Sequence, residues 1–299
     1  MCDMNNIIKR KRLEVGQLCV NIACIIICII LVAPFVLVVT SSLTNEEYLT
    51  RNGYSFFIEN FDITAYKYIW ANIGMILDAY KVTFIFSFVS MLSSVLLMSM
   101  IAYPLARDIM PGKKWISFFL YFTMLFNGGL VPTYILLTKY LHLGNNILVY
   151  ILPSMISPWY VFMMRTSFQG IPKSIVESAY MDGASEYTIF AKFILPMSKP
   201  VLATVALFVF LNKWNDWYTC MLYINDSKLT SLQYLLQRIL LEVEMLKEGG
   251  AEAGLEIVEI PGESIRMALA VVVAGPALVV FPFFQKYFTK GMTVGAVKG

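Results

Sequence analysis

The sequence is poor in charge and rich in apolar residues. Of its 299 residues, 14% are charged and 58% are hydrophobic. A soluble globule of this length needs more polar side chains than this to cover its surface. The composition therefore excludes an ordinary soluble protein and predicts a membrane protein.

Several chemistries also lack the residues that they require. His142 is the single histidine, so no site can be built from several histidines. Gly112-Lys113-Lys114 lacks the upstream glycine and the hydroxyl residue of a phosphate-binding loop, and no set of nucleophiles, metal ligands or paired acids is apparent. We therefore expect no catalytic residue, no metal and no bound cofactor, and we do not expect this chain to hydrolyse ATP by itself.

The cysteines and the basic residues suggest no special partner. Cys24 and Cys28 share a helical spacing of four inside an apolar run. They could bind a soft metal, but packing or lipid contact is favoured because no histidine or acid lies beside them. The net charge is only +3, and the basic residues form short clusters at the ends of apolar segments. This distribution excludes nucleic acid as a partner.

The chain contains six mainly apolar segments that are long enough to cross a membrane. They cover roughly residues 16–40, 80–106, 115–138, 146–166, 200–222 and 265–286. The first is too long for a cleaved signal peptide, so we expect a retained anchor. Assigning the N-terminus to the cytoplasm places most of the 23 Lys and Arg residues inside. The sequence therefore predicts an all-α membrane protein with six transmembrane helices and both termini in the cytoplasm.

This topology divides the chain into parts with different surroundings. We expect a cytoplasmic segment 1–15, one transmembrane domain 16–286 and a cytoplasmic tail 287–299. An external loop 223–263 separates the last two predicted spans. Apolar residues recur at helical spacing from Ser231 to Lys247, which predicts a helix inside that loop.

Some of the predicted spans are not plain apolar rods. The second carries five serines, small residues that let helices approach closely: Ser87, Ser90, Ser93, Ser94 and Ser99. The third is interrupted at residues 127–129 and Pro132, and the fourth contains Pro153 and Pro158. Non-helical backbone is tolerated at membrane depth only where protein or a water-filled cavity surrounds it. These interruptions favour a transport pathway over a simple anchor.

The fifth predicted span ends in a polar and aromatic segment. Lys213 and Asp216 are three residues apart and could form an ion pair on one helix face. The alternative is that this segment forms part of the wall of the transport pathway. The sequence does not decide between the two interpretations.

The segment between the fourth and fifth predicted spans has the signals of two short helices. Ser174 and Glu177 have the spacing of a capping box, which predicts a helix that begins there. The Asp182-Gly183 pair predicts its end, and Ser185 can cap a second helix. Pro196 is expected to stop or kink this second helix before the next span. A compact helical element of this kind suits a partner's groove.

This segment, residues 171–200, resembles the EAA motif of ABC-importer permeases, a Glu-Ala-Ala triplet followed by a glycine and later by Leu-Pro. The matching residues are Glu177, Ser178 and Ala179 at the triplet, Asp182, Gly183 and Ala184 at the turn, and Leu195 and Pro196 near the end. Ser178 replaces the usual alanine with another small residue. Residues 126–134, 214–217 and 295–299 also resemble carbohydrate importers of the maltose-transporter-like class.

The resemblance implies a type I importer in the bacterial cell membrane. The expected partners are a second, different permease subunit, two ATPase subunits that bind ATP and Mg²⁺, an extracellular solute-binding protein and membrane lipid. The cargo is expected to be an oligosaccharide. The residues implied in ATPase docking are Ser174, Glu177, Ser178, Ala179, Asp182, Gly183, Ala184, Leu195 and Pro196.

Aromatic rings can stack against the C–H faces of sugars, and this suggests candidates for the cargo path. They are Tyr134, Trp214, Asn215, Asp216, Trp217 and Tyr218. Aromatic residues at span ends are equally common as membrane-interface anchors. Two other functions remain open, an importer for peptide or another polar solute and an ion-coupled secondary transporter. The second is less favoured because Asp216 is the only acid clearly inside a late span and no inverted repeat is apparent.

Overall fold

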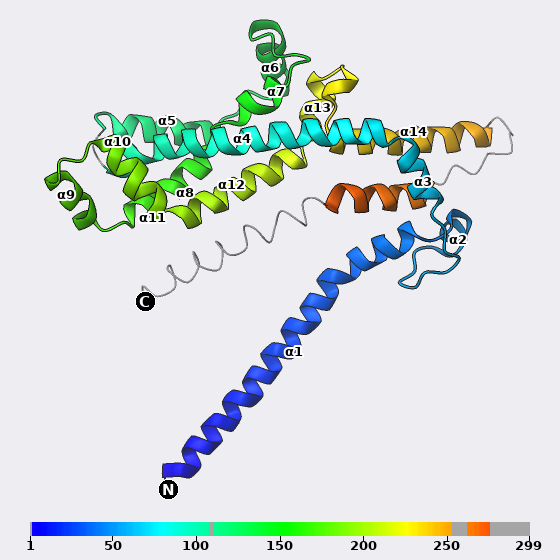
Figure 1. Cartoon of the computed structure of the whole chain (residues 1–299), viewed down its shortest axis with the longest axis horizontal. Helices are drawn as coiled ribbons and strands as arrows, with labels where there is room; N and C mark the ends of the chain where they lie inside the picture. The colour runs from blue at the N-terminus through cyan, green and yellow to red at the C-terminus, as the bar shows by residue number, and fades with distance from the viewer. Residues whose placement is uncertain (1, 108–109, 253–261, 276–299) are drawn as a thin grey trace. The chain divides into compact units, whose positions relative to one another are not determined.

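The computed structural model describes residues 2–107, 110–252 and 262–275, and nearly all of its regular structure is helical (Figure 1). Within these ranges the one β-type pairing is an isolated antiparallel bridge between Thr44 and Phe61. The end of the sixth predicted span and the predicted tail 287–299 lie outside the described residues. The chain forms two compact units, residues 1–72 with 240–272 and residues 73–239 with 273–299.

The first unit contains the long helix α1 (Cys2–Ser42) and two short helices, α2 (Glu46–Asn52) and α3 (Thr64–Ala71). Residues 17–42 of α1 are long and apolar enough to cross a membrane. The first predicted span therefore lies in one continuous helix of sufficient length and hydrophobicity.

A carboxylate near the start of the first unit holds the N-terminus of a helix near its end. Residues 262–275 are helical. Glu46 accepts hydrogen bonds from the backbone N–H groups of Gly262 at 2.8 Å, Glu263 at 2.9 Å and Ser264 at 2.8 Å. The first N–H groups of a helix have no partner within the helix, and the helix dipole favours an anion there. The Glu46 carboxylate thus joins two segments that are more than 200 residues apart in sequence.

A second contact strengthens the same junction. The Tyr54 hydroxyl donates a hydrogen bond to the Glu263 carboxylate at 2.8 Å. Because this bond needs the protonated tyrosine, it raises the pKa of Tyr54 above its ordinary value, and burial adds to the effect.

The second unit is organised around one long helix, α4 (Ile73–Arg107). This helix packs against α8 (Pro158–Gln169) and α12 (Lys199–Trp214), as Figure 1 shows. Ser87, Ser90 and Ser94 of α4 are fully buried. Their small side chains allow neighbouring helices to approach closely. The predicted role of the serines is confirmed for these three residues.

The predicted interruptions of the spans are present as breaks between helices. Helix α5 (Lys113–Leu125) meets the pair formed by α6 (Leu130–Ile135) and the π-helical turn η1 (Leu136–Tyr140) at an angle of 112°. A short helix α7 (Leu148–Ile151) and the 3₁₀ turn η2 (Leu152–Ser154) precede α8, which begins at Pro158. The third and fourth predicted spans are therefore not continuous helices.

The segment after α12 turns back onto α4. After α12 come α13 (Tyr218–Tyr223), the 3₁₀ turn η4 (Ser227–Leu229) and α14 (Leu232–Glu252). The helix predicted between Ser231 and Lys247 is thus confirmed. The backbone N–H of Leu232 donates to the Thr83 hydroxyl of α4 at 2.8 Å.

Two buried rings mark the core of the second unit where α4 and α7 meet. Phe86 and Tyr150 are stacked with ring centroids 4.2 Å apart and planes 5° apart. The Tyr150 hydroxyl donates to the carbonyl of Leu229 at 2.9 Å. This core fixes the middle of α4 against the segments that contain the helix breaks.

Candidate functional site

The first helix of the 171–200 loop is α9 (Lys173–Met181). The predicted capping box at Ser174 and Glu177 is wrong, because the N-cap residue is Pro172 and no side chain caps this helix. Proline has a backbone angle suited to a helix start, and the carbonyl of Pro172 accepts the first turn's bond from the N–H of Ile175 at 3.3 Å. Ser174 therefore lies two residues past the N-cap position, inside the helix, and cannot act as its cap.

The predicted end of this helix at Asp182 and Gly183 is confirmed. Gly183 has φ of 76°, in the left-handed region that glycine adopts without strain. The N–H of Gly183 donates to the carbonyl of Tyr180 at 2.9 Å, and that of Ala184 donates to Ala179 at 3.0 Å. These two bonds form a Schellman motif and satisfy carbonyls that would otherwise have no partner in the helix.

The second helix of the loop begins as the sequence predicts. It consists of α10 (Glu186–Ile189), the π-helical turn η3 (Phe190–Ile194) and α11 (Leu195–Met197). The Ser185 hydroxyl accepts the backbone N–H of Thr188 at 3.3 Å and so caps this helix.

Pro196 explains how the second helix ends. Proline has no N–H to donate to the carbonyl four residues before it, and its ring crowds that carbonyl. A wider π-helical turn lies directly before this point, and the helix then bends by 78° into α12. The predicted kink is confirmed, with the break at Ser198.

The 171–200 loop has one buried and one exposed side. Val176 and Ala179 of α9 are buried, and Ala184 and Leu195 are half-buried. Among the residues predicted for docking, the exposed ones are Ser174, Glu177, Ser178, Asp182, Gly183 and Pro196. Met181, at the end of α9, is 88% exposed and was not among the residues predicted for docking. Its place four residues after Glu177 is the signal that could have revealed it, since this spacing puts both on one helix face.

A cavity of about 410 Å³ lies where three helix breaks of the second unit meet. We call it the break cavity. Its lining residues come from the break before α6, from η2 and from the junction of α12 with α13: Asn127, Gly129, Leu130, Thr133, Leu137, Val149, Pro153, Ser154, Lys213, Tyr218, Thr219, Leu222 and Tyr223. The lining thus combines amide, hydroxyl, phenol and ammonium groups with apolar side chains.

Among the described residues that line this cavity, Lys213 is the one with a charged side chain, and it belongs to an ion pair. Lys213 Nζ lies 3.2 Å from Asp216 Oδ2, and each side chain is 12% exposed. Asp216 also accepts the backbone N–H of Thr219 at 3.0 Å and its hydroxyl at 2.8 Å. The predicted pair is therefore present, and Lys213 of this pair lines the cavity, so the two interpretations of this segment are compatible.

One aromatic residue proposed from the sequence lines the cavity, and others contact residues that line it. Tyr218 is 45% exposed and lines it. The Tyr134 ring stacks on that of Tyr223, a lining residue, with centroids 5.5 Å apart. Trp217 meets the Tyr218 ring edge-on at 5.7 Å. Tyr134 and Trp217 therefore support the tyrosines of the wall.

Two other candidates are held by neighbouring groups. Trp214 is 3% exposed and packs between Tyr80 and Phe210, at centroid distances of 6.1 and 5.8 Å. The Asn215 side chain donates to the carbonyl of Leu211 and accepts from Gln233. Both residues stabilise the end of α12 rather than face the break cavity.

Five lining residues with polar groups were missed by the sequence interpretation: Asn127, Thr133, Ser154, Thr219 and Tyr223. Each lies within a few residues of a glycine, a proline or an acid at a helix break, which is the available signal. Among the described residues, no group of three His, Cys, Asp or Glu side chains could hold a metal ion.

Comparison with known proteins gives the class of this molecule. Residues 68–294 match the model of the family described as binding-protein-dependent transport system inner membrane components. The chain belongs to this family. Family membership confirms the predicted membrane location and the predicted permease function, and it decides against an ion-coupled secondary transporter.

Individual relatives of this family member cover most of its length. Protein LplC of Bacillus subtilis is 34% identical over 270 residues, 90% of each chain. The polygalacturonan/rhamnogalacturonan transport system permease protein YtcP of the same organism is 35% identical, over 91% of this chain and 94% of its own. The arabinooligosaccharides transport system permease protein AraQ of Halalkalibacterium halodurans is 28% identical, over 97% of this chain and 100% of its own.

A solved structure shares the fold of this family member. It is the crystal structure of a bacterial ABC transporter involved in the import of the acidic polysaccharide alginate. The TM-score is 0.77 at 23% identity, and the match covers 92% of this chain and 97% of the other. The predicted type I ABC-importer permease fold is therefore confirmed.

Proposed function

We propose that this family member forms part of the membrane path of an ATP-driven importer whose cargo is an oligosaccharide. The break cavity is the observation that carries the proposal, because it brings hydroxyl, amide and tyrosine side chains together where three helices are interrupted. Its volume of about 410 Å³ falls within the range of about 300–1,000 Å³ typical of small-molecule sites. The names of YtcP and AraQ, which refer to transport of polygalacturonan or rhamnogalacturonan and of arabinooligosaccharides, support the same cargo class.

The chemistry of the lining suits a polyhydroxylated ring. Asn127, Thr133 and Ser154 can exchange hydrogen bonds with sugar hydroxyls. Tyr218, and Tyr223 supported by Tyr134, can stack against the C–H faces of the ring. Lys213 brings one ammonium group to this wall, and its pairing with Asp216 compensates the charge, so the ammonium can donate a hydrogen bond to a sugar hydroxyl.

We further propose that the 171–200 loop docks on a separate ATPase subunit that holds ATP and Mg²⁺. The exposed row of Ser174, Glu177, Ser178 and Met181 offers polar groups around one apolar anchor, which is a common composition of a binding surface. The Schellman turn at Gly183 makes this row a rigid element. The remaining expected partners are a second permease subunit and an extracellular solute-binding protein.

The proposed topology keeps six spans with both termini in the cytoplasm. Two helices are long and apolar enough to cross a membrane, and two bent pairs raise this number to four among the described residues. The interrupted segment 146–166 and the segment that begins at residue 265 would complete the set. In this arrangement α12 is the part of the second bent pair that crosses the membrane, and the 171–200 loop faces the cytoplasm, where the ATPase subunits lie.

The cargo is tested by reconstituting the complete transporter in liposomes and measuring uptake of a panel of oligosaccharides and peptides. We expect uptake of at least one pectin-derived or arabinose-containing oligosaccharide and none of the peptides. Peptide uptake without any response to the oligosaccharides would overturn the cargo proposal.

The path is tested by replacing Tyr218, the exposed aromatic residue of the break cavity. Tyr218→Ala is expected to raise the KM of uptake about 2–10-fold, because one lost stacking interaction costs about 0.5–1.5 kcal/mol. Tyr218→Phe keeps the ring and should retain most of the affinity. Tyr121→Ala is the control, since Tyr121 is an exposed aromatic residue of α5 that does not line the cavity. An unchanged KM for Tyr218→Ala would exclude this residue from the path.

A further inference from the structure

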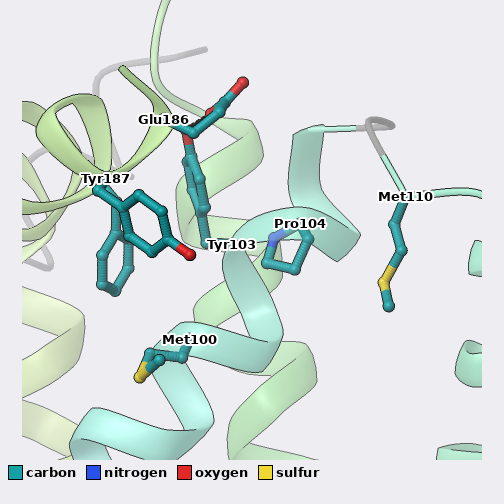
Figure 2. Close-up of a pocket in the computed structure, with 7 residues that line it drawn as sticks. Met100, Tyr103, Pro104, Met110, Glu186 and Tyr187 are labelled. Carbon is teal, nitrogen blue, oxygen red and sulfur yellow. Dashed lines mark hydrogen bonds between the residues drawn. The ribbon is translucent and has the colours of Figure 1, made fainter. Parts of the chain in front are cut away.

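The last turn of α4 is bonded to the second helix of the 171–200 loop. Tyr103 of α4 is buried, and its hydroxyl donates a hydrogen bond to the carboxylate of Glu186, the first residue of α10. The Tyr103 ring also packs against Phe190, with centroids 5.2 Å apart. Figure 2 shows the Tyr103 side chain extending from α4 towards Glu186. The two residues are 83 positions apart in the sequence, so the contact joins separate parts of the chain.

The same turn of α4 also holds the first helix of the loop. The Arg107 guanidinium lies over the rings of Tyr103 and Tyr180, at 5.8 and 5.5 Å from their centroids. Its Nη2 donates to the Tyr180 hydroxyl at 3.3 Å, and Tyr180 belongs to α9. Arg107 thus adds two cation–π contacts and one hydrogen bond to the connection. One turn of α4 thereby contacts both helices of the 171–200 loop.

A proline and an open space lie between these two contacts. Pro104 cannot donate a hydrogen bond to the carbonyl of Met100, which weakens α4 at this point. A cavity of about 400 Å³ borders it, lined by Met100, Tyr103, Pro104, Met110, Glu186, Tyr187 and Phe190 (Figure 2). Met100 and Tyr187 of this lining are exposed, so the space is open to the surface and lets the last turn change its angle without a clash.

We propose that Tyr103 and Arg107 are positioning residues that transmit movement of the 171–200 loop to α4, with Pro104 as the hinge. This inference rests on the proposed function, in which an ATPase subunit moves that loop. From Tyr103, α4 continues for 17 residues to Phe86, about 25 Å along a helix. Phe86 stacks on Tyr150 of α7, and α7 contributes Val149 to the lining of the break cavity. The chain of contacts therefore runs from the loop to the cavity through one helix.

The experiment separates transmission from simple bracing. The complete transporter is reconstituted with Tyr103→Phe, which keeps the ring and removes only the hydroxyl, with Glu186→Ala and with both changes. Basal ATPase activity, ATPase activity stimulated by the loaded binding protein, uptake and ATPase co-purification are measured. We expect uptake and stimulation to fall about 3–10-fold in each single variant, while basal activity and co-purification stay unchanged in Tyr103→Phe.

Three comparisons sharpen this result. The double variant should be no worse than either single variant, because both remove the same hydrogen bond. Glu186→Gln retains an acceptor oxygen and should restore most of the stimulation. Tyr121→Phe removes the hydroxyl of an exposed residue of α5 and should behave as the wild type.

Each outcome has a definite meaning. Full stimulation and uptake in Tyr103→Phe, or strictly additive losses in the double variant, would overturn the transmission role. Loss of ATPase co-purification in Tyr103→Phe would also overturn it and show a brace that holds the loop in shape. If changes at Gly183 alone leave ATPase association and uptake unaffected, the docking role of the loop is refuted. That outcome is distinct from a failure of the transmission role.

Discussion

The 171–200 loop and the break cavity are built in different ways. The loop is held by bonds between residues close in sequence, such as the turn at Gly183 and the cap at Ser185. The cavity needs residues from three helix breaks, and its wall depends on the packing of α4, α7 and α13. The loop should therefore keep its shape when it moves, whereas the cavity should change whenever the helices around it shift.

The largest effect is expected in the cavity wall, from removal of one partner of the Lys213–Asp216 pair. Both side chains are 12% exposed. Lys213→Ala should lower the free energy of unfolding by about 3–5 kcal/mol, because it leaves a shielded carboxylate without its counter-charge. Denaturant titration of the detergent-solubilised chain measures this change.

A second Lys–Asp pair in the same unit provides a matched control. Lys81 and Asp78 have the same spacing in sequence and lie 3.0 Å apart, but their side chains are 69% and 65% exposed. Lys81→Ala should cost less than about 1 kcal/mol. Equal losses of stability in the two variants would show that burial does not determine how much the Lys213–Asp216 pair contributes to the free energy of unfolding. That result would contradict the difference drawn between the loop and the cavity.

A smaller effect is expected at the turn of the loop. Gly183→Ala should cost about 1–2 kcal/mol, because an L side chain is strained at a φ of 76°. Co-purification of the ATPase subunit should fall by up to about tenfold. Gly183→Asn is the control, since asparagine tolerates this backbone conformation better than most residues.

No atom within 4 Å would meet a Cβ atom added at Gly183, so backbone strain is the effect that this pair of variants isolates. If the alanine and asparagine variants bind the ATPase equally, the strained turn is not what shapes the docking surface.

The smallest effect compares two serines of the loop. Ser185→Ala removes a helix cap and should lower the free energy of unfolding by about 1 kcal/mol. Ser174→Ala should change it by less than about 0.5 kcal/mol, because Ser174 is exposed and caps no helix. The melting temperatures of the two variants check this difference. A larger loss for Ser174→Ala would show that the Ser174 side chain caps α9 as a capping box predicts. The N-cap at Pro172 would then be contradicted.

The sequence predicted the loop better than the cavity for a physical reason. Glycine at a helix end and serine at a helix start act through bonds to residues within a few positions, so Gly183 and Ser185 could be interpreted locally. The prediction at Ser174 was wrong because the sequence contains two helix-start signals close together, Pro172 and Ser174. The proline determines where the helix begins.

The breaks themselves were predictable from glycine and proline, but their meeting point was not. Asn127, Ser154 and Thr219 share one cavity only because residues of α4, η1, α7 and α13 pack into one core beside it. The contact between Tyr103 and Glu186 spans 83 positions and leaves no periodic trace in the sequence. Apolar length likewise predicted six spans, whereas helix length and bending give two to four among the described residues.

The Glu46 carboxylate has a consequence for biosynthesis. Its three backbone partners begin 216 residues later in the chain. At about 5–20 residues per second, a ribosome needs roughly 10–40 seconds to reach them after Glu46 has been made. During that interval the anion must remain hydrated, so the first unit can close only after most of the second has been synthesised.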